Sequence, residues 1–483
     1  MANRTAAGCV AAGGEPEGDP SIASMALRRT NDCARIVLLL ALGLALVSTP
    51  TTAQAAKKKT IATELRKLYR AGSIDQATYD ADRAILADVK RRIRRLSGTR
   101  RYELAGVLAT TEGIAAHGKL RASRLPPLFL QLQRNAEYWT ASPLLSSGAR
   151  VSFPGSELVF QYFPGQGLQL HPLANFGKLN AYAKGSKRNN ARNTLLLDEL
   201  MSIAVPRGGG LAWEYYFNFD GGSPPWVSSL AQGTGLQAIA RSAVKLGRQD
   251  ELFPEISAGL KLFEQRTPTG VRVKGPNGTE YAQYSFAPGL TILNGFIQSL
   301  VGLWDVADLT GDPRAAALFE AGDRTARKIV PSFDTGAWSL YSRGTSSYES
   351  NLSYHELLRD FLTSICDRTQ TPVYCTTEQR FTGYLTTPPV LELATKRLRG
   401  GKTGVLTYSL SKISSTAISV TAPSGRTVLS VAAGIVGHGK RTVSWNVPRR
   451  AGIYTVRISA TDLAGNRGGV TEQVEVLKPR KRG

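Results

Sequence analysis

Residues able to transfer protons lie close together between Leu340 and Leu358. The segment reads LYSRGTSSYESNLSYHELL and contains Tyr341, Arg343, Tyr348, Tyr354 and His355. A phenol acts as acid or base when neighbouring charge lowers its pKa from about 10, and a guanidinium suits a carboxylate. These residue types fit proton transfer on a carboxylate substrate. The competing interpretation is structural, with packed tyrosine rings, a helix-start histidine and a solvated arginine.

The chain as a whole is strongly basic. It holds 60 Lys and Arg against 37 Asp and Glu over 483 residues, for a formal net charge of +23. This balance predicts a polyanionic partner. We exclude nucleic acid as that partner, because no repeated basic helix, zinc-ligand spacing or aromatic RNA-binding signature is present.

Residues 1–55 have the pattern of a signal peptide, with Met25 as an alternative start. Three arginines precede an apolar run from Ile36 to Val47, which is shorter than the roughly 20 residues of a membrane span. Ala53 and Ala55, with Gln54 between them, suit cleavage after Ala55. We therefore expect a secreted or cell-surface protein, and it stays basic because four Arg and four acidic residues leave together.

Cys366 and Cys375 are the two cysteines that follow this leader, and they lie close together in CDRTQTPVYC. A local disulfide suits an exported protein. A catalytic thiol is the competing interpretation, but no nearby His or basic cluster would lower the thiol pKa. The four His residues are dispersed and form no cluster with carboxylates, so we predict no resident metal and no cofactor, while a metal requirement for turnover stays open.

The elements that position these residues begin with a basic helical segment, residues 56–125. Apolar residues recur at helical intervals from Thr60 to Arg100, with a break near Gly72-Ser73, and predict two helices. Their Arg and Lys residues either form solvated faces or bind a polyanion.

Residues 126–395 contain two stretches with one plan, 224–265 and 289–329. Each has an apolar helix, a Gly-Asp turn or a similar break, and a second amphipathic helix. Stacked hairpins of this kind predict an α/α toroid with a cleft formed by the loops at one end. Gln232 and Asn294 lie in the apolar helices and are candidate substrate-binding residues, although close helix packing explains the glycines beside them equally well.

Residues 396–478 change to short alternating β-branched runs separated by Gly, Pro and Asn. This pattern predicts a β-sandwich, and GIYTVRISATDLAGN resembles the last strands of immunoglobulin-like modules on bacterial surface enzymes. We expect an attachment or spacer role, with cell-surface or cell-wall association, followed by a basic tail at 479–483. The predicted fold is thus mainly α, an α/α toroid with a C-terminal immunoglobulin-like sandwich.

Four stretches carry a resemblance to a known family. They are LHPLANFGKLNAYAKG from Leu170, WVSSLAQGTGLQAIARS from Trp226, QYSFAPGLTILNGFIQSLVGLWDVADLTGD from Gln283, and FDTGAWSLYSRGTSSYESNLSYHELL from Phe333. In order and spacing they resemble the C-terminal catalytic domain of D-glucuronyl C5-epimerases, which act on heparosan and heparan-type chains. The likeness covers most of residues 165–390.

The resemblance implies that Tyr284, Tyr341 and Tyr354 are the catalytic residues. Tyr341 and Tyr354 take proton transfer or glycosidic-oxygen contacts, and Tyr284 positions the substrate. Arg343, His355 and Gln283 would lie beside them as substrate-binding residues.

The sequence departs from the family pattern at two places. Where the family has Glu-Tyr-Pro, this chain has Gln283, Tyr284 and Ser285, and an amide cannot act as general base. Glu280 is an alternative carboxylate three residues earlier. The family's second histidine, three residues after His355, is replaced by Leu358.

The resulting hypothesis is an epimerase that inverts C5 of glucuronate residues in an acidic polysaccharide by removing and returning a proton. A polysaccharide lyase is an alternative, since removal of the same hydrogen can be followed by loss of the C4 substituent. A non-catalytic uronan- or cell-wall-binding relative is a second alternative, and Gln283 is the residue that favours it. The polymer and the oligomeric state are left open.

Overall fold

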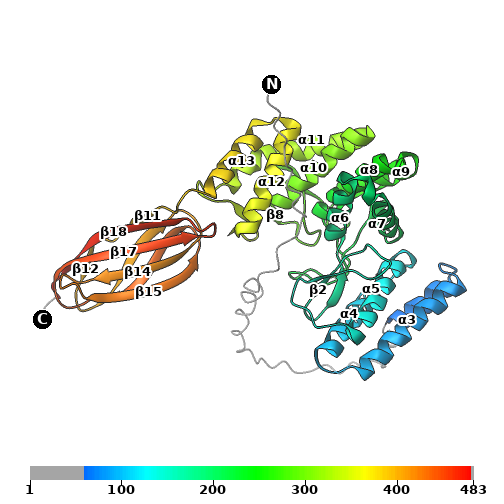
Figure 1. The fold of residues 1–483 in the computed structure, drawn as a ribbon, viewed down its shortest axis with the longest axis horizontal. Coiled ribbons are helices and arrows are strands. Elements are labelled where there is room, and N and C mark those ends of the chain that lie inside the picture. The colour runs from blue at the N-terminus through cyan, green and yellow to red at the C-terminus, as the bar shows by residue number, and fades with distance from the viewer. Residues whose placement is uncertain (1–58, 480–483) are drawn as a thin grey trace, which may run out of the picture. The chain divides into compact units, whose positions relative to one another are not determined.

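The computed structural model describes residues 59–479, which form two compact units (Figure 1). The first takes the chain up to Lys178 together with Ala191–Val205 and Glu214–Pro225. The second takes Leu179–Asn190, Pro206–Trp213 and the chain from Trp226 onward. The expected signal peptide and the basic tail after Pro479 lie outside the described residues. No helix within 59–479 is both long enough and apolar enough to cross a membrane.

The first unit begins with the two helices that the sequence predicts. They are α2 (Ile61–Arg70) and α3 (Gln76–Arg95), and the break near Gly72-Ser73 is confirmed. Two further helices follow, α4 (Gly98–Ala116) and α5 (Leu125–Ala141). Thr60 caps α2 by accepting from the Thr63 amide, and Asp75 caps α3 by accepting from the Thr78 amide, as side chains commonly do at helix starts.

A three-stranded antiparallel sheet packs on these helices, with strand order β1 (Arg150–Val151), β2 (Phe160–Phe163), β3 (Gly167–Leu170). The buried Glu103 carboxylate of α4 accepts hydrogen bonds from the Tyr162 hydroxyl at 2.9 Å and the Gly165 amide at 2.8 Å. Glu103 thereby provides the hydrogen-bond acceptor for the tight turn between β2 and β3. The helices α6 (Pro172–Lys184) and α7 (Asn190–Ser202) follow.

The second unit contains three consecutive helix pairs, seen from green to yellow in Figure 1. They are α8 (Ser229–Leu246) with α9 (Gln249–Glu264), α10 (Leu293–Thr310) with α11 (Pro313–Ile329), and α12 (Leu352–Thr369) with α13 (Pro372–Tyr384). Gly247 and Gly311 end α8 and α10 with φ of 70° and 68°, a backbone conformation that favours glycine. The helix hairpins predicted at 224–265 and 289–329 are confirmed.

The first helices of the three pairs are joined by one buried ionic cluster. Asp305 of α10 accepts from Gln237 of α8 at 2.6 Å and from the Arg368 Nε of α12 at 2.6 Å, and it also pairs with Arg241 of α8. These contacts fix α8, α10 and α12 against one another near their C-terminal ends. Charge-assisted bonds of this kind are shorter and stronger than neutral ones.

Glycines allow α8 and α10 to pack closely. A Cβ on Gly302 would collide with the carbonyl oxygen of Gly233, and a Cβ on Gly233 would lie 3.0 Å from the Cα of Ser299. The two backbones therefore meet where side chains would normally separate them.

Short strands interrupt the helix pairs. One hairpin joins β4 (Val205–Arg207) to β5 (Gly210–Ala212), and another joins β6 (Arg272–Gly275) to β7 (Gly278–Tyr281). A three-stranded sheet has the order β10 (Tyr348–Glu349), β9 (Leu340–Gly344), β8 (Leu290–Ile292). This sheet brings the chain before α10 beside the chain before α12.

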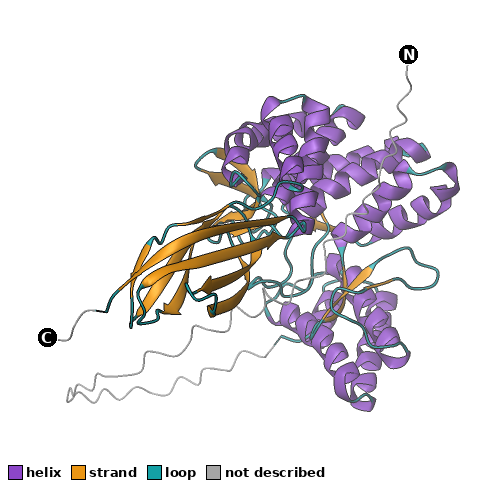
Figure 2. Ribbon diagram, turned by 60° about the vertical axis from the view of Figure 1, so that its left-hand side comes forward, coloured by secondary structure: helices purple, strands orange, loops and turns teal. Residues whose placement is uncertain are grey.

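The strands from Leu391 to Leu477, called the sheet region below, form two sheets that share one hydrophobic core (Figure 2). One sheet has the order β11 (Leu391–Leu393), β13 (Thr403–Leu410), β16 (Gly439–Asn446). The other has the order β12 (Arg397–Arg399), β18 (Arg467–Leu477), β17 (Gly452–Asp462), β14 (Ser414–Thr421), β15 (Thr427–Val436). The side chains of Leu406, Ile418, Trp445 and Val456 lie in the shared core.

The prediction of a mainly α fold, an α/α toroid with an immunoglobulin-like sandwich, is wrong. Strands occur throughout the described chain, in both units and between the helix pairs. In the sheet region a three-stranded and a five-stranded sheet share one core, and no immunoglobulin-like identity is confirmed for them. Helical periodicity reported the helices correctly but not the strand segments between them, because runs of three or four residues carry no clear period.

Candidate functional site

Tyr341 and Tyr354 meet at the start of α12. Their ring centroids are 4.5 Å apart and the rings are inclined by 47°. Tyr341 lies on β9, which is held between β8 and β10, and Tyr354 lies in the first turn of α12. Asn351 caps this helix by accepting from the Tyr354 amide at 2.9 Å. The pair expected from the sequence is thus brought together by a strand and a capped helix start.

Arg343 lies on the same strand as Tyr341, two residues further on. Because alternate residues of a strand share a face, its guanidinium and the Tyr341 phenol lie on one side of β9. Arg343 is exposed and donates to the Ser332 carbonyl at 2.8 Å. The opposite residue in the sheet is Thr291 of β8.

Tyr284 lies among aromatic rings in the segment that leads to β8. The Trp226 ring meets it edge-on at 5.8 Å, and the Phe286 ring stacks on it at 5.5 Å and 14°. The Ser285 amide donates to the Val227 carbonyl at 3.0 Å, which ties this segment to the start of α8. Trp226 and Phe286 were not among the residues expected from the sequence, because neither belongs to a proton-transfer pattern.

Gln283 lies behind Tyr284 and is buried. Its Nε2 donates to the Tyr284 hydroxyl at 3.0 Å, and its Oε1 has no hydrogen-bond partner among the described residues. A Cβ on Gly295 would collide with that oxygen, so the amide packs against the start of α10. The residue at the family's glutamate position therefore contacts one of the three tyrosines directly.

Glu280 reaches the same sheet from β7. Its carboxylate accepts from the Thr291 hydroxyl at 2.7 Å, and Thr291 is the residue paired with Arg343. The structure thus places a half-buried carboxylate one residue from the candidate carboxylate-binding arginine.

His355 is buried beneath Tyr354 and is not open to a substrate. Its Nδ1 lies 2.8 Å from the Ser339 hydroxyl, and its Nε2 lies 3.0 Å from the Phe381 carbonyl. The Trp338 indole stacks on the imidazole at 3.7 Å. Burial lowers the pKa of His355 to about 4, against a smaller opposing effect of the Phe381 hydrogen bond. The structure gives this histidine a packing role in place of the expected substrate contact.

Gln232 and Asn294 are also buried within their helices. The Gln232 Nε2 donates to the carbonyls of Leu211 and Gly259 at 2.9 and 3.2 Å, and the Asn294 Oδ1 accepts from the Gly295 amide at 2.8 Å. These contacts hold neighbouring backbone, and the structure does not group either side chain with the tyrosines. Substrate binding by these residues stays a prediction.

Cys366 of α12 and Cys375 of α13 are joined by a disulfide. It connects the two helices at the end of α12 opposite to Tyr354. Among residues 59–479 no group of three or more His, Cys, Asp or Glu side chains could hold a metal ion.

A family model described as D-glucuronyl C5-epimerase C-terminus matches residues 208–383. The chain resembles D-glucuronyl C5-epimerases over this range. The matched range includes Tyr284, Tyr341 and Tyr354, and it confirms the resemblance inferred from the sequence. It ends before the sheet region, for which no immunoglobulin-like identity is confirmed.

One curated protein and two solved structures are similar to parts of this chain. The D-glucuronyl C5-epimerase of Caenorhabditis elegans is 29% identical over 179 residues, which are 33% of this chain and 29% of that protein. The chain therefore spans well under two thirds of the length of this relative. A sugar epimerase from a ruminal bacterium aligns over 53% of this chain and 69% of its own, with 11% identity and a TM-score of 0.37. The cellobiose 2-epimerase of Bacillus thermoamylovorans aligns over 59% and 74%, with 11% identity and a TM-score of 0.36.

Proposed function

We propose that this protein is a carbohydrate epimerase that inverts C5 of glucuronate residues within an acidic polysaccharide. The observation that carries the proposal is the contact of Tyr341 with Tyr354 beside Arg343, within the range that matches the epimerase family. The reaction breaks the C5–H bond, leaves the electron pair delocalised into the adjacent carboxylate, and returns a proton to the opposite face. Composition and oxidation state stay the same.

The distance between the Tyr341 and Tyr354 rings limits which part of the proton transfer each tyrosine can perform. Carbon atoms in contact are about 3.5–4.0 Å apart, so a sugar between two rings would separate their centroids by about 7 Å or more. Tyr341 and Tyr354, at 4.5 Å, are too close to flank the substrate. We assign this pair to one face of the sugar, with Arg343 supplying charge to the developing enolate.

The opposite face then needs a second group. Tyr284, which accepts from Gln283, is one candidate, and Glu280 beside Thr291 is the other. Either would deliver a proton that the first pair cannot, because inversion requires groups on both sides of the ring.

The test is deuterium incorporation at C5 when the protein is incubated in heavy water with glucuronate-containing polymers. Removing one acid or base costs about 10²–10⁴ in rate, so Tyr354→Phe loses nearly all exchange. Tyr348→Phe is the matched control, because this tyrosine lies in the same segment but is exposed. Equal loss in both variants would contradict the assignment. Loss in Glu280→Gln as well would identify the second group.

The buried amide of Gln283 favours a second candidate function, a binding relative without turnover. In that case the parent binds a uronan but exchanges no deuterium, and Gln283→Glu gains exchange. A lyase would instead give an unsaturated product. The leader pattern at 1–55 supports our further proposal that the protein acts outside the cytoplasm, at the cell surface or secreted.

A further inference from the structure

The sheet region contacts the helix pairs through three of its turns. These are the turn at 411–413 between β13 and β14, the turn at 437–438 between β15 and β16, and the turn at 463–466 between β17 and β18. In the last of these turns Asn466 donates to the Leu385 carbonyl at 2.8 Å. Each turn reaches the end of α13 or the strand β10, so these contacts form one junction.

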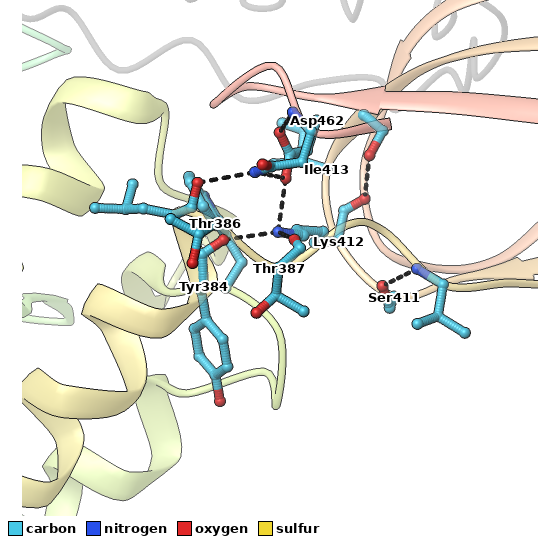
Figure 3. A network of polar contacts seen from close by, with 12 residues as sticks. Tyr384, Thr386, Thr387, Ser411, Lys412, Ile413 and Asp462 are labelled. Atoms are coloured by element: carbon cyan, nitrogen blue, oxygen red, sulfur yellow. Dashed lines mark hydrogen bonds and ion pairs between the residues drawn. The ribbon is translucent and has the colours of Figure 1, made fainter. Parts of the chain in front are cut away.

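Lys412 is the buried centre of this junction (Figure 3). Its ammonium pairs with Asp462 at 2.6 Å and donates to the carbonyls of Tyr384 at 2.8 Å and Thr387. Lys412 is fully buried and Asp462 nearly so. A buried lysine is rare unless it is paired, and here two of its partners belong to the chain around the end of α13.

The aromatic face beside Lys412 packs under the start of α12. The Lys412 ammonium lies 5.4 Å from the centroid of the Trp338 ring, within the range of a cation–π contact. Trp338 in turn stacks on His355, the residue after Tyr354, and its indole nitrogen donates to the Ser350 carbonyl at 2.8 Å. A continuous series of contacts thus joins the sheet region to the start of α12.

Glu349 makes a second connection from the other side. It lies on β10, which pairs with the strand that carries Tyr341 and Arg343. Its carboxylate accepts from the backbone amides of Ile413 at 3.0 Å and His438 at 2.7 Å, and it lies 3.0 Å from the His438 Nδ1. A Cβ on Gly437 would lie only 2.9 Å from this carboxylate, so the turn has closed tightly around it.

We propose that the sheet region positions the candidate active site, with Lys412 and Glu349 as positioning residues. Together they hold the segment from Ser339 to His355, called the tyrosine segment below, which carries both Tyr341 and Tyr354. Neither residue touches the substrate. The effect on catalysis rests on the proposed function, whereas the mechanical link does not. This role differs from the attachment or spacer role expected from the sequence, which stays a prediction.

The first experiment measures the link itself by hydrogen exchange and mass spectrometry on the full chain. In Glu349→Ala and Lys412→Met the tyrosine segment exchanges faster, and in Glu349→Ala the peptides from β14 and β17 keep their protection. The matched controls are Glu475→Ala and Lys396→Met, which remove exposed ion pairs of the sheet region. Unchanged exchange of the tyrosine segment in both test variants would overturn the proposal.

The strands also report whether a variant has unfolded. Lys412→Met leaves Asp462 buried without its cation, so β17 could lose protection together with the tyrosine segment. Glu349→Ala leaves no unpaired buried charge in the sheet region. If β17 loses protection in Lys412→Met, the exchange of the tyrosine segment in Glu349→Ala alone decides whether the proposal holds. Loss of protection confined to the strands, in both variants, would also count against the proposal.

The second experiment follows deuterium incorporation at C5 in the same variants. A misplacement of about 1 Å can cost about 10²-fold in rate, so kcat falls by about tenfold to a hundredfold while KM stays within about twofold. In a variant that is only destabilised, the fraction of folded, active molecules would fall. The tyrosine segment would not exchange faster than the rest of the chain. If the tyrosine segment exchanges faster in the variants but the parent itself incorporates no deuterium at C5, the proposed function is refuted and the positioning link stands. Faster exchange of that segment with full kcat would refute the catalytic part of the inference.

Discussion

The imidazole of His355 links Tyr354 to the packing below it, since both of its nitrogens and one of its faces are occupied. The ring is fully buried, and burial favours its neutral form. The Tyr341–Tyr354 pair therefore packs on a group that acid would protonate, although that group takes no part in the proposed proton transfer.

We expect His355 to make the folded protein sensitive to acid. Its folded pKa of about 4 lies below the ordinary value of about 6.5, so the unfolded state binds the proton first as pH falls. The free energy of unfolding therefore decreases from about pH 6.5 down to about pH 4, by roughly 3 kcal/mol in order of magnitude. Urea unfolding at pH 7 and pH 4.5 measures this decrease.

His355→Gln lacks the ring and should lose that part of the pH dependence, whatever its stability at pH 7. His117→Gln is the control, since His117 is exposed on α4. A parent and a His355→Gln variant with the same decrease would show that another group is responsible.

The tyrosines could be predicted from the sequence because they lie in short motifs, whose residues are close together along the chain. The sequence could not show which way His355 faces, because its partner Phe381 comes 26 residues later. The same holds for Gln283, whose fit against Gly295 depends on how the following segment folds back.

At the level of elements, α3 carries an unusual charge on its buried face. Asp82 is 7% exposed, and its Oδ2 has no hydrogen-bond partner among the described residues. Burial raises the pKa of Asp82 to about 6. The helix is therefore destabilised by an ionised carboxylate above this pH.

Replacing Asp82 by Asn should stabilise the protein at neutral pH. Because the folded pKa lies above the unfolded value of about 3.9, folding takes up a proton at Asp82. The contribution of Asp82 to stability therefore rises as pH falls from about 6 to about 4, opposite in sign to the contribution of His355. Asp82→Asn should therefore raise the free energy of unfolding by about 1–2 kcal/mol at pH 7.5 and by nothing at pH 4. Asp80→Asn, two residues earlier on the exposed face, should show no such gain. A destabilised Asp82→Asn protein at pH 7.5 would contradict this.

The elements themselves were predictable where their period was long. The helices α8 to α11 follow the apolar spacing of the sequence, with glycine at the ends of α8 and α10. The strands β8, β9 and β10 were not predictable, because each holds only a few residues and β8 pairs with β9 across at least 50 residues, as in Ile292 with Ser342. The assembly of the candidate site depends on this pairing.

For the whole molecule, the formal net charge of +23 should govern how the substrate arrives. Attraction between a basic protein and a polyanion weakens as salt shortens the Debye length from about 10 Å at 0.1 M to about 3 Å at 1 M. We expect KM for a uronan to rise several-fold with ionic strength while kcat stays constant, because the proton transfer occurs away from bulk salt. Deuterium incorporation measured across a salt series checks this. A short uronate oligomer is the control, since it carries few charges, and equal salt effects on both substrates would argue against steering by net charge.

The close packing of Gly233 and Gly302 has a consequence for any mutational survey of this protein. Almost every substitution at either position would force α8 and α10 apart. The loss of activity would be as complete as the loss expected on replacing Tyr354. A map of intolerant positions would then highlight two places that never meet a sugar. Scores for abundance, collected beside scores for activity, would tell the two kinds of intolerance apart.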